Sequence, residues 1–401
     1  MASMGAAVIV DAVRTAAGAR NGALSGWHPV DLAAETLRAL TVRNDLDPGL
    51  VDDVIMGCVT QVGAQSGNIG RLAVLGAGWP DSVPGTTIDR KCGSSLQAAH
   101  FAAQGVMAGA YDVVVAAGVE VMSLVPMGAS TVVPAVGKPY GPAVTERFEG
   151  AGGLVPEGMA AEAVAQRYGL SREELDRFSA TSHANAARAA ADGRFVAELL
   201  AVTAKRRDRE TGRPVVRRQR MTADEGVRPA TSVTSLGRLL PAFAPDGVIT
   251  AGNSAQITDG ASALLIMSER RAAALGYTPR ARFHSFAVAG ADPLTMLTAP
   301  VPATRKALHR AKLALDDLDL VEIHESFAAT VLAWAQDLRP DMDKVNVNGG
   351  AIALGHSMGA SGARLLTTLC HELERRGGRY GLVTMSAVGG MANATVIERL
   401  G

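Results

Sequence analysis

Hydrophobic and polar positions follow two different periods along the chain, and this pattern predicts layered α/β structure. Runs rich in β-branched residues at 6–13 and 51–59 are typical of strands, while residues 28–44 between them carry apolar positions at helical spacing. A buried helix is expected over 95–110, leading directly into a strand over 111–120. Because strand and helix patterns alternate, we expect sheets covered by helices.

The composition of the sequence changes between residues 121 and 248, where Pro and Gly become more frequent. Two amphipathic helices are expected inside this segment, over 157–169 and 171–190. The second has a clear start signal, because Ser171 is followed three residues later by Glu174, which is the spacing of a capping box. After residue 248 the alternation of strand and helix patterns resumes.

One order of elements occurs twice in the chain. Residues 92–120 run from a turn of small polar residues through a helix pattern to a strand that ends near glycine, and residues 358–390 do the same. Two regions with the same order of elements indicate a duplicated fold.

Composition and charge narrow the class of protein. The 401 residues exceed what one hydrophobic core organises, so two domains or one large layered unit is expected. The 39 Lys and Arg residues balance 39 Asp and Glu residues, so the chain lacks the excess positive charge that is typical of proteins binding nucleic acid or an anionic membrane. Three cysteines form neither a disulfide framework nor a zinc spacing. Because the sequence shows no signal peptide and no long apolar span, we expect a cytoplasmic protein.

Cys92 is the first candidate for chemistry, because it stands at a junction between a strand pattern and a helix pattern. If the helix begins just after Arg90 or Lys91, its free N–H groups would lower the pKa of the thiol and could stabilise a negative oxygen. A small buried hydrophobic residue is the alternative interpretation. Cys58 and Cys370 fit that alternative, since one lies in a strand run and the other on an apolar helix face.

Two histidines lie at similar junctions. His356 lies in a glycine-dense loop before a helix, where the backbone leaves an imidazole free to point into a site. His324 ends a strand beside Glu325 and Ser326. A thiol nucleophile needs a base, so Cys92 with these two histidines predicts acyl transfer.

Several blocks of the chain, in order, resemble the thiolase family, the CoA-dependent enzymes that make or cleave a carbon–carbon bond beside a thioester. The match covers nearly the whole length. The blocks are CGSSLQA at the nucleophile, VAAGVEVMS in the next strand, ITAGNSAQITDGASA after the loop segment, HESFA in place of Asn/His-Glu-Ala-Phe, NVNGGAIALGHSMGASGAR at the base and GGMANATVIE in the last strand.

This resemblance implies an α/β fold in which two similar halves stack into five αβαβα layers, with an inserted loop domain. Residues 1–121 and 249–268 would form the N-terminal half with the nucleophile, 122–248 the CoA-binding loop domain, and 269–401 the C-terminal half. It further implies CoA thioesters as substrates, no bound cofactor or metal, and a homodimer or homotetramer without nucleic-acid or membrane partners.

The resemblance also assigns roles to single residues. Cys92 would accept the acyl group, and His356 would activate it and help hold the thioester oxygen. His324 takes the position where many thiolases have Asn and a minority have His. In the loop domain, a CoA-binding stretch would place Arg228 and Ser235 near the adenine end, with Phe243 and Phe327 lining the pantetheine tunnel. Without the resemblance, Arg228 would be interpreted as a solvated loop residue.

The last block departs from the family pattern. Ser386 stands where thiolases usually have a second cysteine, which moves the proton at the α-carbon of acetyl-CoA. The pKa of an alcohol lies far above that of a thiol, so serine is a poor general acid or base at neutral pH. Val388 stands where a glycine normally gives a backbone N–H to the oxyanion site, Ser357 replaces the proline after the base, and Ala255 replaces a frequent CoA-contacting serine.

The resemblance therefore predicts an acyl-CoA C-acyltransferase of fatty acid or polyketide metabolism. It would act through an acyl-Cys92 intermediate, cleaving 3-ketoacyl-CoA or condensing acyl-CoA units, with an atypical second half-reaction. One alternative is a decarboxylative, ketosynthase-like condensing enzyme or a thioester-processing transferase, since loss of CO2 from a malonyl donor makes a carbanion without an α-proton base. A second alternative is a catalytically silent CoA-binding partner subunit.

Overall fold

The computed structural model describes residues 5–132, 137–208 and 210–401. Its helices are α1 (Pro29–Asn44), α2 (Ile69–Gly76), α3 (Ser94–Met107), α4 (Pro142–Phe148), α5 (Glu157–Arg167), α6 (Arg172–Ala191), α7 (Val233–Leu236), α8 (Glu269–Ala274), α9 (Pro300–Ala311), α10 (Ala328–Leu338), α11 (Ala351–Leu354) and α12 (Ser361–Arg376). The strands are β1 (Ala7–Thr15), β2 (Gly18–Ala19), β3 (Asp53–Gly57), β4 (Gly85–Ile88), β5 (Val113–Val121), β6 (Leu199–Leu200), β7 (Val202–Arg207), β8 (Pro214–Met221), β9 (Thr258–Ser268), β10 (Ala281–Gly290), β11 (Leu320–Ile323), β12 (Tyr380–Ala387) and β13 (Met391–Arg399). In the part of the chain so described, no helix is both long and apolar enough to cross a bilayer.

The sheet strands show the predicted duplication. Their order is β11-β12-β13-β10-β1-β9-β5-β3-β4, and the halves meet at an antiparallel pairing of β1 with β10. In each half, a parallel pair (β3–β5 or β11–β12) is followed by an antiparallel partner (β9 or β13). The regions that share one order of elements in the sequence become α3–β5 and α12–β12, so the predicted duplication is confirmed.

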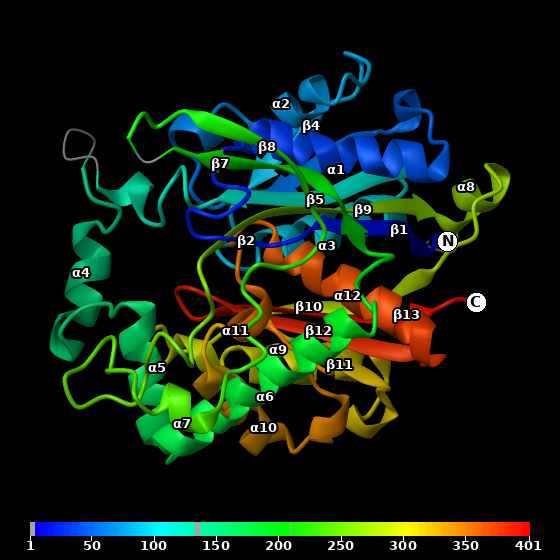
Figure 1. The fold of residues 1–401 in the computed structure, drawn as a ribbon. Coiled ribbons are helices and arrows are strands. Elements are labelled where there is room, and N and C mark those ends of the chain that lie inside the picture. Colours follow the sequence, from blue (N-terminus) through cyan, green and yellow to red (C-terminus); the bar gives the residue numbers. More distant parts are fainter. Residues whose placement is uncertain (1–4, 133–136, 209) are drawn as a thin grey trace.

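Five layers follow from this arrangement (Figure 1). Helices α1 and α2 cover the outer face of the N-terminal half of the sheet, and α9 and α10 cover the outer face of the C-terminal half. Helices α3 and α12 lie between the halves and share one apolar core with strands from both. The predicted α/β fold with duplicated αβαβα layers is therefore confirmed.

The central layer depends on close backbone contact at two glycines. A Cβ atom on Gly118 of β5 would overlap the carbonyl oxygen of Gly359, and one on Gly359 would lie 2.5 Å from the carbonyl oxygen of Val119. Only glycine leaves room for that approach. The loop before α12 is thereby held directly against the strand that follows α3.

A local signal in the sequence predicted the start of α6. The capping box of α6 is present, because the Ser171 hydroxyl accepts from the N–H of Glu174 at 3.3 Å and the Glu174 carboxylate accepts from the N–H of Ser171 at 2.8 Å. Helix α3, however, begins at Ser94, later than expected after Arg90 or Lys91. Lys91 has a left-handed φ of 51°, and its N–H donates to Asp89 at 2.6 Å, so these residues form a turn before the helix.

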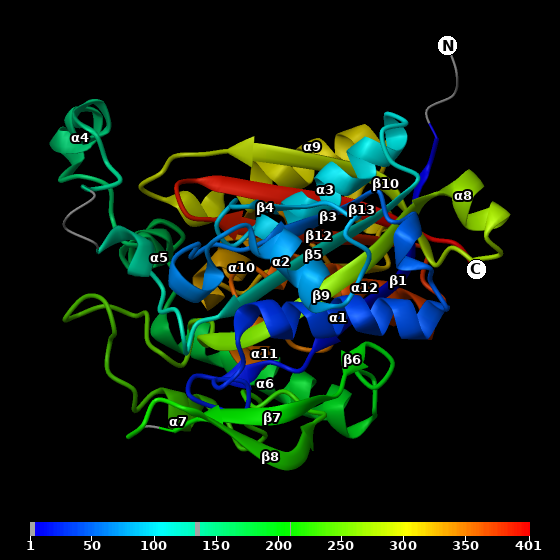
Figure 2. The ribbon, with the colours of Figure 1, turned by 90° about the horizontal axis from the view of Figure 1, so that it is seen from above.

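The segment 122–248 leaves the layered body and forms a periphery (Figure 2). It contributes α4 to α7, the β7–β8 hairpin and β6, which pairs with β1. Strand β8 is exposed along nearly its whole length, and its three arginines, Arg217, Arg218 and Arg220, form a solvated basic face. The boundaries of a separate loop domain at 122 and 248 stay a prediction.

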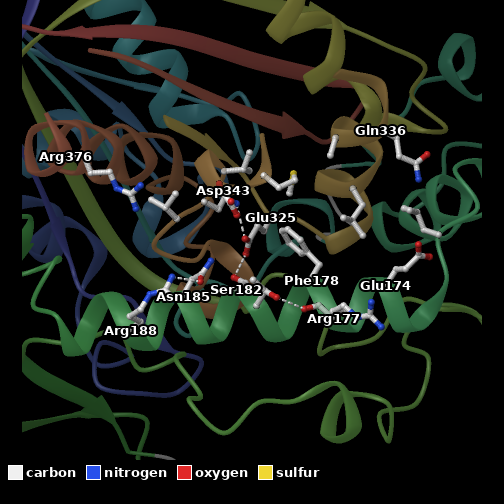
Figure 3. A pocket seen from close by; sticks show the side chains of 18 residues that line it. Glu174, Arg177, Phe178, Ser182, Asn185, Arg188, Glu325, Gln336, Asp343 and Arg376 are labelled. Atoms are coloured by element: carbon white, nitrogen blue, oxygen red, sulfur yellow. Dashed lines mark hydrogen bonds between the residues drawn. The ribbon is translucent and has the colours of Figure 1, made fainter. Parts of the chain in front are cut away.

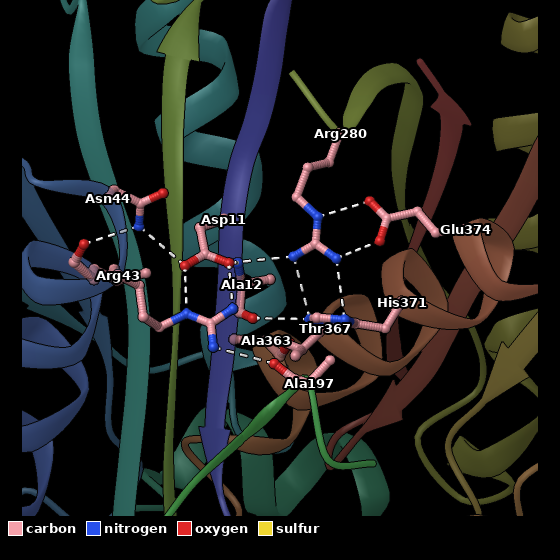
Figure 4. Close-up of polar contacts among 11 residues, drawn as sticks. Asp11, Ala12, Arg43, Asn44, Ala197, Arg280, Ala363, Thr367, His371 and Glu374 are labelled. Atoms are coloured by element: carbon pink, nitrogen blue, oxygen red, sulfur yellow. Dashed lines mark hydrogen bonds and ion pairs between the residues drawn. The ribbon is translucent and has the colours of Figure 1, made fainter. Parts of the chain in front are cut away.

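An ionic network ties the two halves together on the side of β1 (Figure 4). Asp11 of β1 accepts from the guanidinium of Arg43 at 2.7 Å and from that of Arg280 at 3.2 Å. Arg280 also pairs with Glu374 and contacts His371 of α12. Elements from both halves therefore meet at one set of charges.

A second, more deeply buried network holds the peripheral segment to the core. Arg14 of β1 binds Asp224 through two parallel hydrogen bonds of 2.7 and 3.0 Å, and Glu198 at 2.5 Å. All three side chains are almost completely buried. Bidentate charge-assisted pairs of this kind fix geometry strongly.

Replacing Asp224 with Asn should destabilise the protein by about 3 kcal/mol, because it leaves part of the Arg14 charge buried without its partner. Urea unfolding of wild type and variant measures the shift in midpoint at unchanged slope. The control is Asp246→Asn, since Asp246 is an exposed aspartate of the same segment. Equal midpoints for the two variants would contradict the assigned role of Asp224.

Candidate active site

Four of the predicted site residues lie near the ends of strands or in the turns that precede helices. Cys92 lies in the turn before α3, and His356 lies in the loop before α12. His324 follows β11, and Ser386 lies near the end of β12. Parallel strands β11 and β12 end side by side, and the His324 N–H donates to the Thr384 carbonyl at 2.9 Å. This backbone hydrogen bond places His324 beside the last residues of β12.

Cys92 is buried, and two backbone N–H groups face its sulfur. The N–H groups of Cys92 itself and of Val388 hydrogen-bond the sulfur in its charged form, and both lower the pKa of the thiol. Burial raises that pKa more strongly, and a negative charge on Glu157 raises it further. The expectation that the helix start lowers the pKa of Cys92 is therefore wrong, because loss of water outweighs the N–H groups.

This correction changes how the nucleophile must be activated. A thiol with a raised pKa is not a thiolate at neutral pH, so a neighbouring base has to take its proton. The other two cysteines agree with the interpretation as buried packing residues. Burial raises the pKa of Cys58, and it raises the pKa of Cys370 to about 12.

His356 is held as a base by its neighbours. The Ser361 hydroxyl donates to the Ser357 carbonyl at 3.0 Å, so it accepts from Nδ1–H of His356 at 2.7 Å. This assigns the proton to Nδ1 and leaves the lone pair on Nε2, which has no partner among the described residues. Burial lowers the pKa of His356 to about 3, with the positive charge of Arg364 adding to the effect.

His324 lies against His356, with ring centroids 4.2 Å apart. It is fully buried, and neither ring nitrogen has a hydrogen-bond partner within the described ranges. Burial lowers the pKa of His324 well below its usual value, with His356 and Arg364 contributing. The ring is therefore neutral and has one N–H to offer to an oxygen of a bound molecule.

Ser386 is completely buried, and its hydroxyl lies 3.1 Å from that of Ser326. The Val388 side chain, two residues further on, packs against the apolar cluster that contains Phe327. The Ser386–Ser326 pair thus joins the end of β12 to the segment after β11, and the Val388 N–H approaches the Cys92 sulfur.

Two buried carboxylates hold the loops around these residues. Glu325 accepts from Ser182 at 2.8 Å, from Asn346 at 2.9 Å and from the N–H of Ile352 at 3.0 Å. Glu120 of β5 accepts from the N–H of Gly359 at 2.9 Å. These contacts connect the strand ends to the loop that carries His356.

Two of the predicted CoA-binding residues, Arg228 and Ser235, are exposed. Arg228 is exposed, and its guanidinium donates to the side chain of Gln256 at 3.3 Å. The carbonyl oxygen of Gln256 accepts from the N–H of His356 at 2.8 Å. Ser235 is exposed as well, and its hydroxyl is used in the capping box of α7 with Ser232.

Phe243 and Phe327 face one another edge to face, with ring centroids 5.9 Å apart. Phe327 is buried, whereas Phe243 is partly exposed at 43%. The Phe243 ring also packs on Gly158, where a Cβ atom would overlap it. The two rings thus extend from the protein surface at Phe243 to the buried apolar cluster that Val388 contacts.

A cavity of about 790 Å³ lies elsewhere, between α6 and α10 (Figure 3). Its wall includes Ser182 and Glu325, which hydrogen-bond one another, but not Cys92 or His356. This cavity therefore reaches the back of the loop that carries His324 rather than the nucleophile.

Sequence reasoning missed several residues that shape the site. Ser361 fixes the tautomer of His356, Gln256 holds the backbone of His356, and Ser326 pairs with Ser386. Ser361 and Ser326 stand within a few residues of the predicted histidines, but no periodicity indicates which way their hydroxyls point. Within the described ranges, no group of three or more His, Cys, Asp or Glu side chains is arranged to hold a metal ion.

Comparison with known proteins covers the whole chain. The family model described as "Thiolase, N-terminal domain" matches residues 7–270, and "Thiolase, C-terminal domain" matches residues 277–399. Steroid 3-ketoacyl-CoA thiolase FadA6 of Mycobacterium tuberculosis is 47% identical over 406 residues, spanning 100% of this chain and 95% of that protein. A 3-ketoacyl-CoA thiolase of Erwinia tasmaniensis is 45% identical, over 98% of this chain and 99% of the relative. The crystal structure of the Bacillus anthracis acetyl-CoA acetyltransferase superposes with a TM-score of 0.88 at 37% identity, covering all of both chains.

Proposed function

The chain belongs to the thiolase family and is an acyl-CoA C-acyltransferase, and from that premise we propose that it cleaves a 3-ketoacyl-CoA by thiolysis through an acyl-Cys92 intermediate. The observation that carries this proposal is the pair of N–H groups, of Cys92 and Val388, at the sulfur. Two such donors can hold the oxygen of a thioester formed on Cys92 and stabilise its negative charge in the transition state.

In the first half-reaction, Nε2 of His356 takes the proton of the Cys92 thiol. The tautomer set by Ser361 supports this role, because the lone pair on Nε2 is free. The thiolate then attacks the 3-keto carbon, and the bond between the α- and β-carbons breaks. His324 offers its N–H to the thioester oxygen of the departing acetyl-CoA, where enolate charge develops.

In the second half-reaction, the thiol of CoA attacks the acyl-Cys92 thioester and releases the shortened acyl-CoA. Ser386 stands where the family resemblance places a second cysteine. Its hydroxyl pairs with that of Ser326 and cannot titrate near neutral pH. Another group must therefore give the proton that the α-carbon takes up in the first half-reaction and take the proton that the CoA thiol loses in the second.

We also propose that CoA lies along Arg228, Ser235, Phe243 and Phe327. The exposed guanidinium of Arg228 suits a phosphate or adenine end, and the two rings suit the apolar pantetheine arm. The link from Arg228 through Gln256 to the backbone of His356 supports this path.

A homodimer or homotetramer remains part of the proposal. Strand β4 is the end strand of the sheet order, and Leu72, Leu75 and Phe101 on the neighbouring helices α2 and α3 are partly exposed, between 38% and 43%. Exposed apolar side chains on helices that contact an end strand of the sheet support contact with a second copy.

Intact-protein mass spectrometry tests the proposed function. The protein is incubated separately with acetyl-CoA, with acetoacetyl-CoA or 3-oxooctanoyl-CoA plus free CoA, and with malonyl-CoA, and the released products are identified. We expect a covalent acyl adduct on Cys92 and cleavage of a 3-ketoacyl-CoA at about 1–10² turnovers per second.

The same experiment separates the alternatives. Product formed only when malonyl-CoA is present would replace thiolysis with decarboxylative condensation. An adduct on Cys92 without any product would indicate a thioester-processing transferase. Neither adduct nor product with any of the thioesters would leave a silent CoA-binding subunit and contradict the proposal.

A further inference from the structure

Thiolysis needs a group that gives a proton to the α-carbon of the departing acetyl unit. Ser386 cannot titrate near neutral pH, burial lowers the pKa of the neutral His324 ring, and His356 holds the thiol proton that it returns when Cys92 leaves. One further titratable side chain acts on the nucleophile, since a negative charge on Glu157 is the largest charge effect on the Cys92 thiol. The roles assigned so far leave Glu157 without a function.

Glu157 is the first residue of α5, and the start of this helix forms a wall of the site. The next residue, Gly158, packs directly against the Phe243 ring. The first turns of α5 share an apolar cluster with Phe327 and with the side chain of Val388. The start of α5 therefore packs beside the aromatic pair, in the apolar cluster that also contacts the Val388 side chain.

A carboxylate at the first position of a helix has an ordinary explanation, because it complements the helix dipole. That explanation suits an exposed, ionised side chain. Oε1 of Glu157 is instead shielded from solvent, and it has no hydrogen-bond partner among the described residues. Burial raises the pKa of Glu157 to about 7, which keeps the group near half-protonated at neutral pH.

We propose that Glu157 is the acid and base that moves the proton at the α-carbon, the role for which the family resemblance expects a cysteine at position 386. The assignment rests on the proposed function, since it concerns the same acyl-transfer reaction. A carboxyl group here also disfavours a malonyl donor, because its ionised form would repel the donor carboxylate.

The proton balance of thiolysis closes with this assignment. His356 takes the thiol proton, the Cys92 thiolate attacks the β-carbon, and the bond between the α- and β-carbons breaks. The electron pair left on the α-carbon takes the proton of Glu157, which gives acetyl-CoA and a carboxylate. The thiol of free CoA then attacks the acyl group and returns a proton to Glu157, while Cys92 leaves as a thiolate and regains its proton from His356.

Few other charged side chains lie on the elements around Glu157 where they could shift its pKa. Helix α5 packs against α10 and against the short helix Met296–Thr298. The short helix has no charged residue, and the one charged residue of α10 is Asp337, which binds Tyr168 beyond the opposite end of α5. On α5 itself, Glu162 accepts from the N–H groups of Val248 and Ile249. Arg167, the last residue of α5, lies over the Tyr168 ring, and burial is the cause that raises the pKa of Glu157.

Proton transfer at the α-carbon can be measured without carbon–carbon bond cleavage. The measurement follows, by NMR, the exchange of the methyl protons of acetyl-CoA in D2O. Glu157→Gln should lower the enzyme-catalysed exchange by about 10²-fold or more, because the amide neither takes nor gives the proton. Acylation of Cys92 by acetyl-CoA, measured by intact mass, should persist in this variant. Glu173→Gln, the same change at an exposed position of α6, is the control and should exchange like wild type.

The pH dependence gives a second readout that a structural role would not move. Abstraction needs the carboxylate, so exchange by wild type should rise with pH and level off above about 7, whereas Glu157→Gln should lose this step. Wild-type exchange in Glu157→Gln would overturn the assignment while leaving the proposed function intact. Loss of Cys92 acylation together with exchange would also overturn it, because the residue would then act on the nucleophile or the fold. Wild type that neither acylates Cys92 nor cleaves a 3-ketoacyl-CoA would instead refute the proposed function.

Discussion

Replacing Cys92 with alanine should lower thiolysis of a 3-ketoacyl-CoA by about 10⁴-fold or more and remove the covalent acyl adduct. The reason is that no other cysteine of the chain can take over. Cys58 packs in the apolar cluster that includes α1 and α2, and Cys370 lies within α12, so neither occupies the turn before α3. Steady-state thiolysis with free CoA, together with intact mass after incubation with acetyl-CoA, measures both effects.

The matched control for this experiment is Cys370→Ala, which removes a thiol of α12 that packs in the central core. It should keep both the adduct and turnover within a few-fold of wild type. Turnover by Cys92→Ala above about a tenth of wild type would contradict an acyl-Cys92 intermediate. Folding of Cys92→Ala is checked by its unfolding midpoint, since the side chain is buried in the same core.

The sequence predicted those parts of the fold that depend on local signals. The Ser171–Glu174 spacing marked the start of α6, because a capping box satisfies backbone groups within a single turn. The repeated order of elements predicted the two halves, because each half joins a parallel strand pair through a segment that contains its own helix, α3 or α12. These features need no knowledge of distant residues.

Properties that depend on residues far apart in the chain could not be predicted from the sequence. The pKa of Cys92 is the clearest case, since the sign of its shift depends on how much water the assembled layers exclude. The Ser326–Ser386 pair joins residues 60 positions apart in the chain, so spacing could not reveal it. Glu157 reads as an ordinary first-turn acid until its neighbours Phe243 and Val388 are placed around the helix start.

Replacing His356 with Gln should lower kcat/KM for thiolysis by about 10³-fold at neutral pH. Burial raises the pKa of the Cys92 thiol, so without a base only a small fraction of the enzyme carries a thiolate. That fraction grows with hydroxide concentration. The residual rate of the variant should therefore increase by about tenfold per pH unit above neutrality, whereas wild type needs no such assistance.

Rates of acylation and thiolysis between about pH 6 and 9 distinguish this role from a structural one. His284→Gln makes the same change on β10, where the ring lies away from the site beside Tyr380, and it should leave the pH profile unaltered. A His356→Gln profile parallel to wild type would mean that the imidazole only positions the loop before α12. A profile that rises where wild type is level requires that the thiol proton is lost to His356, because Ser361 already occupies the other ring nitrogen and leaves Nε2 as the base.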